Sequence, residues 1–463
     1  MIKRSIAFLS FFLITAVPVW SDTGVEVRAI YSKSPALERL IIDLIEHSEE
    51  LLSLKEELAA LAEEVPVAGA LDDPRLGGGV ANLPTDSFSF DQDPMTQKQL
   101  FIAQKFPWFG KLDLRTQRAA IAVERQQALI DVKTQVLVKS LALAFYDLGF
   151  VREGLRFNLE LTQMVKQMLR VAEAVYASGR GLQQDVFQGQ VEVSKLIDEQ
   201  VSLEGQQRVL VSRINELLNR SDFMPVEKFE RFDFLQIDLD PGEVRDLAIR
   251  HNPQLRVRQA EIDKALVNIA LARKNFYPDM DFKVGYGQRD EGNMGNDQPD
   301  FVSASVVVNI PLYQHRKQGR QLTAALKRHR STTKAYENQQ QALPHQVDAI
   351  LHEIDAIREN YRLFKGGLVQ QADLWSRASL AAYEVGKLDF GTMINAHVRR
   401  LRFELQAEKY RFEIYKKLTE LETVTGTALA DIEVTPRKEK TPSGNRSKVV
   451  SRRRAAASKA GVN

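Results

Sequence analysis

Histidine, aspartate and glutamate are the residue types in this chain that could bind a metal ion or transfer a proton. The seven histidines are scattered, and even the nearest two, His345 and His352, stand seven positions apart. A zinc-binding helix places two histidines four positions apart, and "HEID" at His352 lacks the second histidine of such a motif. There is no cysteine, which excludes thiolate ligands and disulfides. We therefore predict no catalytic residues, no metal site and no cofactor, and we do not expect an enzyme.

The carboxylates are better explained as the charged faces of long helices. A run such as "EHSEELLSLKEEL", which begins at Glu46, carries its acids at the spacing of a solvated helix surface. Proline is absent from residues 108–224 and 345–435. These stretches predict long helices over Leu112–Ser178 and His315–Glu384, each about 100 Å long at ~1.5 Å per residue.

Three further features refine the helical prediction. Pro344 lies inside the second long helix and is expected to kink or break it. Shorter helices are predicted from Pro35 to about Glu64 and from Pro253 to about Asn275, because proline suits the first turn of a helix. An apolar seam with steps of three and four favours coiled-coil-like packing. The seam consists of Leu161, Met164, Met168, Val171 and Val175.

The two ends of the chain differ from the rest. Residues 1–21 combine two basic residues, an apolar run and small residues before the expected cleavage point, which predicts a signal peptide. An uncleaved membrane anchor is the alternative. Residues 431–463 form a basic, disordered tail, with nine Lys or Arg and one Glu from Pro436 onward. For an exported chain we expect this tail to be solvated or to touch lipid headgroups or peptidoglycan, and we expect no nucleic acid partner.

A tandem duplication is indicated by motifs that recur in the same order. Pro107 and Pro311 each follow an alternating stretch, and "YASG" at Tyr176 is repeated as "YEVG" at Tyr383. We predict a first repeat over residues 22–224 and a second over 225–430, each with a helix, a strand pair and a helical hairpin. The hairpin turns contain glycines expected to adopt left-handed conformations. These are Gly179, Gly181 and Gly386.

The strand pair of the second repeat alternates apolar and polar residues with period two. "PDMDFKVGYGQ" and "DFVSASVVVNIP" each present one apolar face. The corresponding strands of the first repeat, "DPRLGGGVANLP" and "MTQKQLFIAQKFP", are less clear because three glycines weaken a strand. An apolar face can be the buried side of a soluble sheet or the lipid-facing wall of a barrel. In a barrel, the lipid-facing residues would be Phe282, Val284, Val302, Val306 and Val308.

Four strands in one chain cannot close a barrel, and they leave two open edges. Open edges are hazardous in water and untenable in lipid, where every backbone group needs a partner. A membrane-embedded sheet therefore requires that several copies of the chain pool their strands in a closed ring.

Taken together, these features resemble the TolC-type outer-membrane efflux protein family. The signal peptide, the duplication, the strand pairs and the Tyr-x-x-Gly turns carry the resemblance, which covers nearly the whole chain between residues 22 and 430. Within the family, "DDPRLGGGVANLP", "DQDPMTQKQLFIAQKFPWFGKLDLR" and "HNPQLRVRQAEIDKALVNIALARKNFYPD" are most similar to outer-membrane components of heavy-metal cation (RND-type) efflux systems.

This resemblance implies a mixed α+β membrane channel. Three chains would each give four strands to a 12-stranded transmembrane β-barrel, and their long helices would form an α-barrel across the periplasm. The homotrimer would be the exit duct of a tripartite efflux pump, together with a periplasmic adaptor and an inner-membrane pump. It would passively conduct metal cations or small toxic compounds across the outer membrane. A type I protein secretion partner and an exported coiled-coil scaffold stay open as alternatives.

The resemblance also implies roles for particular residues. Three sets of residues are assigned, at the periplasmic tips, at the gate and at the corners where the barrel meets the helices. The corner residues would lie near the membrane–water boundary or would simply pack the corner. The tips that contact the adaptor are Tyr176, Gly179, Gly181, Leu182, Tyr383, Gly386 and Leu388; the gate region is Asp185, Gln188, Thr392 and Asn395; the corners are Pro107, Trp108, Pro311 and Tyr313.

The gate is where this chain departs from the family. The best-known member closes its periplasmic end with two carboxylates in the second hairpin, and the matching positions here are the uncharged Thr392 and Asn395. Asp185 still matches a family aspartate in the first hairpin. We therefore expect weaker block by polyvalent cations than in relatives that carry a carboxylate ring.

Overall fold

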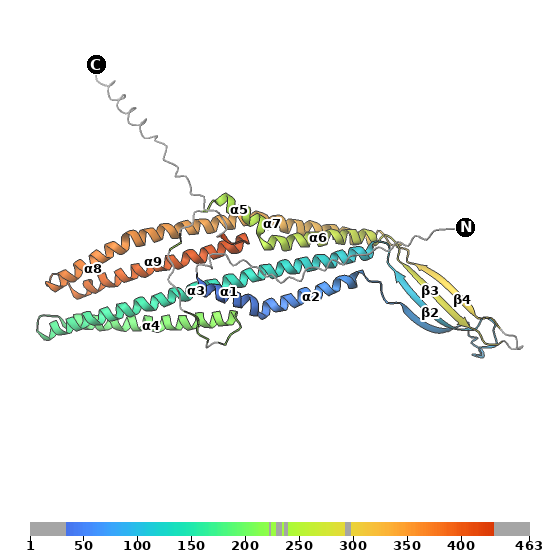
Figure 1. Cartoon of the computed structure of the whole chain (residues 1–463), viewed down its shortest axis with the longest axis horizontal. Helices are drawn as coiled ribbons and strands as arrows, with labels where there is room; N and C mark the ends of the chain where they lie inside the picture. The colour runs from blue at the N-terminus through green and yellow to red at the C-terminus, as the bar shows by residue number, and fades with distance from the viewer. Residues whose placement is uncertain (1–33, 222–223, 228–233, 236–238, 292–297, 430–463) are drawn as a thin grey trace, which may run out of the picture.

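The chain folds into a long rod with strands at one end and helical hairpins at the other (Figure 1). This computed structural model describes residues 34–221, 224–227, 234–235, 239–291 and 298–429. The predicted signal peptide (1–21) and basic tail (431–463) lie outside the described residues.

The elements of the rod follow one another in two similar series. The first comprises α1 (Pro35–His47), α2 (Glu49–Gly69), β1 (Arg75–Ala81), β2 (Gln97–Phe106), α3 (Lys111–Ala177) and α4 (Gln183–Leu217). The second comprises α5 (Pro241–His251), α6 (Pro253–Lys274), β3 (Met280–Gln288), β4 (Phe301–Val308), α7 (Gln318–Leu363), the π-helical segment η2 (Phe364–Leu368), α8 (Val369–Glu384) and α9 (Phe390–Thr425). The predicted mixed α+β fold with four strands is confirmed.

The long helices have the predicted positions, with three corrections. The helix expected over Pro35–Glu64 is divided at Ser48, whose hydroxyl accepts a hydrogen bond from the Leu51 amide and caps α2. Helix α5 was not predicted. Pro344 was expected to kink or break the helix, and the break is wrong, because α7 runs through this residue. Leu343 and Val347 on either side are fully buried, and their packing holds the helix together despite the lost backbone bond.

The core of the rod lies along α3. Its central part packs with α1, α7 and α9 around Phe145 and Tyr146, both fully buried. Nearer the tips, Leu161 and Val165 pack against α4 and α9. The predicted seam is right at Leu161 but wrong at Val171, which is 51% exposed, while Ala172 is buried. Steps of three and four drift around a straight helix, so a seam extended over several turns leaves the packed face.

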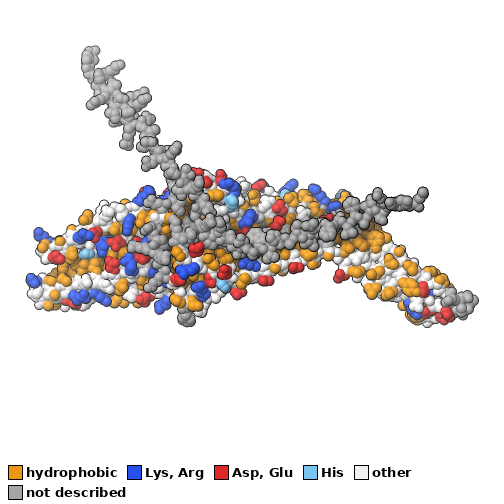
Figure 2. All heavy atoms as spheres, viewed as in Figure 1, with side chains coloured by type: hydrophobic (Ala, Val, Ile, Leu, Met, Phe, Trp, Pro, Cys, Tyr) orange, Lys and Arg blue, Asp and Glu red, His pale blue; other side chains and the backbone are white. Residues whose placement is uncertain are grey.

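The four strands form one antiparallel sheet in the order β1-β2-β3-β4. Its register places Leu76, Ile102 and Val284 in one row, and these side chains are between 50% and 73% exposed. Figure 2 shows hydrophobic side chains covering much of the visible surface at this end of the rod. The next row, on the opposite face, contains Gly77 and Phe101. A Cβ at Gly77 would collide with the Phe101 ring, so the glycine that weakened the strand prediction makes room for that ring.

An ion pair between a buried lysine and a partly buried aspartate joins the strand end of the rod to the helical wall. Lys111, at the start of α3, is 5% exposed, and its Nζ lies 2.7 Å from Oδ1 of Asp279, just before β3. The same oxygen accepts a hydrogen bond from the Trp108 amide at 2.9 Å. The Trp108 ring stacks on Tyr277, with 5.2 Å between centroids. Asp279 therefore ties the β2–α3 corner to the α6–β3 corner.

We expect Lys111→Met to destabilise the rod by about 1–3 kcal/mol, because the partly buried Asp279 carboxylate loses its cation and a charge-assisted hydrogen bond. The double variant K111M/D279N removes both charges and should be less destabilised than K111M alone. The measurement is the midpoint of the heat-induced loss of helical circular dichroism in mild detergent. Equal midpoints for K111M and the parent would show that the pair does not hold the corner.

Candidate functional site

The helical tips lie at the end of the rod opposite the strands (Figure 1). Gly179 and Gly386 have φ values of +71° and +72°, as the left-handed turn prediction required. The prediction is wrong for Gly181, whose importance is steric: a Cβ there would lie 2.9 Å from the Tyr176 amide nitrogen. Leu182 is 66% exposed and Tyr176 is 46% exposed, so the first tip offers surface for a partner.

The second tip is more firmly packed. Tyr383 and Leu388 are partly buried against the cluster that contains Phe390, and the rings of Tyr383 and Phe390 lie 5.7 Å apart. Phe390 also brings the two hairpins together, because a Cβ at Gly189 of α4 would meet its ring at 3.3 Å. The tips are therefore neighbouring parts of one packed end.

The structure brings residues of the predicted gate region close together. Gln188 of α4 lies directly against Gly391 of α9, where its side-chain amide occupies the space that a Cβ would need. Thr392 is half-buried, whereas Asn395 is exposed. The amide and hydroxyl of Thr392 both donate to the Asp389 carboxylate, at 2.8 and 2.6 Å. Asp389 is the N-cap of α9.

Asp389 is the gate-region residue that sequence reasoning missed. Burial and, next, the negative charge of Asp389 raise the pKa of Asp185 above its usual range. The hydrogen bonds from Thr392 hold the pKa of Asp389 below its usual range. The two hairpins thus face each other with one carboxylate each, although Thr392 and Asn395 are uncharged. The Asp-x-x-Thr spacing of a helix N-cap was the available signal.

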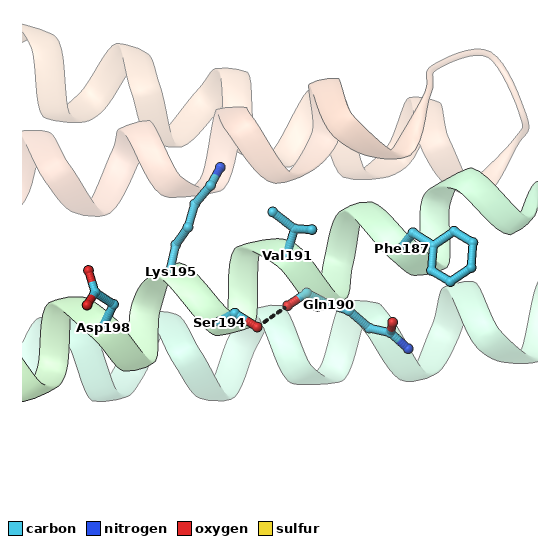
Figure 3. Close-up of a pocket in the computed structure, with 6 residues that line it drawn as sticks. All are labelled: Phe187, Gln190, Val191, Ser194, Lys195 and Asp198. Atoms are coloured by element: carbon cyan, nitrogen blue, oxygen red, sulfur yellow. Dashed lines mark hydrogen bonds between the residues drawn. The ribbon is translucent and has the colours of Figure 1, made fainter.

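An open groove runs along α4 near the tips (Figure 3). All of its lining residues come from this helix, so it is an exposed helix face and not an enclosed pocket. Phe187 and Val191 are 55% and 54% exposed, and the Ser194 hydroxyl is bound to the Gln190 carbonyl at 3.0 Å. The lining residues are Phe187, Gln190, Val191, Ser194, Lys195 and Asp198.

The predicted corner residues lie where the strands give way to helices. Pro107 and Trp108 are half-buried in the first corner, and Pro311 is half-buried in the second. Tyr313 is 75% exposed. The two corners therefore differ, since Trp108 stacks within the chain and Tyr313 extends outward.

Among the described residues, no three His, Asp or Glu side chains gather as a metal site would require. No helix in the same part of the chain has the length and apolar content needed to cross a bilayer.

The chain was compared with known protein families, curated proteins and solved structures. Residues 244–427 match the family described as outer membrane efflux protein. No curated protein matches the chain. Three solved structures share the fold: the outer membrane protein VceC from Vibrio cholerae, CusC, studied for transmembrane channel formation, and the open state of the outer membrane channel MtrE from Neisseria gonorrhoeae.

The similarity to these structures is in fold and not in sequence. VceC is 15% identical with a TM-score of 0.72, covering 86% of this chain and 97% of VceC. CusC is 13% identical with a TM-score of 0.73, covering 89% of this chain and 96% of CusC. MtrE is 14% identical with a TM-score of 0.71, covering 86% of this chain and 90% of MtrE. The match over residues 244–427 and the shared fold agree with the efflux-protein resemblance, and the heavy-metal subtype is a proposal.

We expect Asp185→Asn to stabilise the tips at neutral pH, because it removes a carboxylate whose ionisation is disfavoured by burial and by the charge of Asp389. The raised pKa of Asp185 means that its ionisation costs stability at neutral pH and that the cost disappears as pH falls through this pKa. Surface charge pairs are worth less than about 1 kcal/mol, so amide hydrogen exchange at the tips should slow by at most about fivefold.

The measurement is hydrogen exchange of residues 177–190 and 383–395, corrected for the intrinsic pH dependence. Asp198→Asn, at an exposed site farther along α4, is the matched control. A slowing that persists unchanged at acidic pH, or that D198N reproduces, would contradict the repulsion between Asp185 and Asp389.

Proposed function

We propose that this chain is the outer-membrane exit duct of a tripartite efflux pump, with a large periplasmic extension. It conducts substrates passively from the periplasm or pump to the outside and performs no catalysis. The efflux-protein family match at residues 244–427 and the channel fold support this function.

The observation that carries the proposal is the exposed apolar face of an open four-stranded sheet. Val284, Val302 and Val306 are 51%, 78% and 55% exposed, and Phe282 and Val308 are also exposed on the same face. Among the described residues, strands β1 and β4 each have one unpaired edge. Lipid can cover the apolar face, but only further strands can satisfy the edges. A homotrimer that pools its strands into a 12-stranded barrel meets both needs.

The rest of the rod fits the same role. Helix α3 has 67 residues and extends about 100 Å at ~1.5 Å per residue. This length takes the tips far from the membrane, where a periplasmic adaptor and an inner-membrane pump would meet them. The tip residues named above would contact the adaptor, and the gate region would lie between the hairpins. We also interpret the two series of elements as repeats over residues 22–224 and 225–430.

The substrate class rests on the motif resemblance, which favours metal cations or small toxic compounds. A type I protein secretion system would use the same kind of duct and is the second candidate. An exported coiled-coil scaffold accounts for the helices, but in water it would leave the apolar face of the sheet exposed.

We expect Val306→Arg to prevent insertion, because an arginine facing lipid costs roughly 2–4 kcal/mol at the bilayer midplane. Ser305→Arg is the matched control, since it places the same side chain one position away on the opposite face. The parent and S305R should be extracted from outer membranes in mild detergent as trimeric hollow rods with a detergent belt at the strand end. V306R should be missing from that fraction.

A soluble parent monomer or dimer that needs no detergent would remove the barrel and the efflux assignment with it. Equal insertion of V306R and S305R would assign the apolar face to something other than lipid.

The gate region generates a separate prediction. The double variant T392D/N395D should be blocked by hexaamminecobalt(III) at least about tenfold more tightly than the parent, because it adds two carboxylates per chain to the narrow end. Conductance of the trimer in planar bilayers measures the block, and T392N/N395Q is the uncharged control. Tight block of the parent itself would show that the existing carboxylates already form a cation-binding ring.

A further inference from the structure

In the part of the chain that the structure describes, the helical wall next to the strands is a single layer with two free edges. In this part of the rod α2 packs on α3, α3 on α6 and α6 on α7, so that α2 and α7 lie on opposite sides (Figure 1). Ala325 of α7 packs against Ile269 and Ala272 of α6. The opposite faces of α2 and of the first part of α7 are therefore left for a neighbour.

The free face of α2 carries a row of glutamates, here called the acidic row. Glu49, Glu56 and Glu63 are spaced by seven, and all three are exposed. Seven residues make nearly two full helical turns, so the three side chains share one face. Leu51, which is buried, lies on the face toward α3. In the described part of the chain no salt bridge involves the acidic row, whereas the adjacent Glu50 pairs with Lys133 of α3.

The free face of α7 carries a matching basic row. Arg320, Lys327 and Lys334 are also spaced by seven and are exposed, and the buried Ala325 points the other way. Arg320 and Lys327 make no salt bridge with any described residue, and Lys334 pairs only locally with Glu337 at 2.6 Å.

The positions between the charges suit close packing of two helices. On α2 they include Leu52 and Val67, which are 38% and 71% exposed. On α7 they include the small residues Thr323, Ala324 and Ser331, all of them at least partly exposed. Charged residues at every seventh position, with small or apolar residues between them, are typical of coiled-coil seams between partner helices.

We propose that the acidic row of one copy docks on the basic row of the next copy around the ring. The inference rests on the proposed function for the existence of a closed ring and adds the contact that orders it. Helix α2 runs toward the strands and α7 runs away from them, so the two rows meet antiparallel with opposite charges along the contact. An α2–α2 or α7–α7 contact would place like charges together, which selects head-to-tail closure.

The test reverses each row as a whole, so that it does not depend on which glutamate meets which cation. The variants are E49K/E56K/E63K, R320E/K327E/K334E and the combination of all six changes. The ratio of trimer to monomer is measured by native mass in mild detergent after extraction or refolding, with circular dichroism to verify the helices. E57K/E64K, on the same helix but off the row, is the control.

We expect each reversed row to lower the trimer-to-monomer ratio at least about tenfold. The variant that combines all six substitutions should restore most of this ratio. The control should stay within about twofold of the parent. Rescue by the swap would also exclude a general folding defect in the triple variants.

Other outcomes overturn this contact in distinguishable ways. A parent that forms no trimer contradicts the proposed function itself. A trimeric parent whose reversed rows still assemble contradicts only the contact between rows. Reversed rows that assemble but lose binding of an adaptor would assign these faces to that partner instead of a second copy.

Discussion

Every backbone amide and carbonyl within a membrane needs a hydrogen-bond partner, and under the proposed function this constraint governs the strand end of the rod. Strands β2 and β3 meet this need within the chain, since each has a neighbouring strand on both sides, whereas no described strand pairs with the outer edges of β1 and β4. In the proposed ring, both edges close on identical strands of other copies, so the smallest functional unit is larger than the chain.

A closed ring of strands requires that each copy hold its sheet at one angle to its helices. Lys111, Asp279 and the Trp108 amide provide this link, since one carboxylate oxygen accepts bonds from the start of α3 and from the preceding corner. A charge-assisted hydrogen bond depends on the distance and angle between its groups, whereas apolar packing has no preferred direction. These contacts fix the orientation of the sheet relative to the helical wall.

Sequence reasoning found what periodicity encodes and missed what depends on contacts between distant segments. Alternation over Phe282–Tyr286 gave the correct strand and its exposed face. The long stretch without proline predicted α3 correctly to within one residue at each end. Pro344 does not break α7, because Leu343 and Val347 are packed in the core. This packing could not be predicted from the local sequence. Asp389 was missed for a related reason: its carboxylate matters because α4 brings Asp185 close to it, across some two hundred residues of chain.

The helical wall faces a closure problem of a different kind from that of the sheet. Every strand edge presents the same backbone donors and acceptors. Backbone hydrogen bonds can therefore join two copies, but they do not specify which helix faces come into contact. Helices satisfy their own backbones, so only side chains can specify a neighbour. A row of carboxylates on α2 and a row of cations on α7 supply that choice, because a charge pattern distinguishes head-to-tail from every like-to-like contact. In this arrangement backbone bonds close the sheet in the membrane, while side-chain charges fix the order of copies in the wall beneath it.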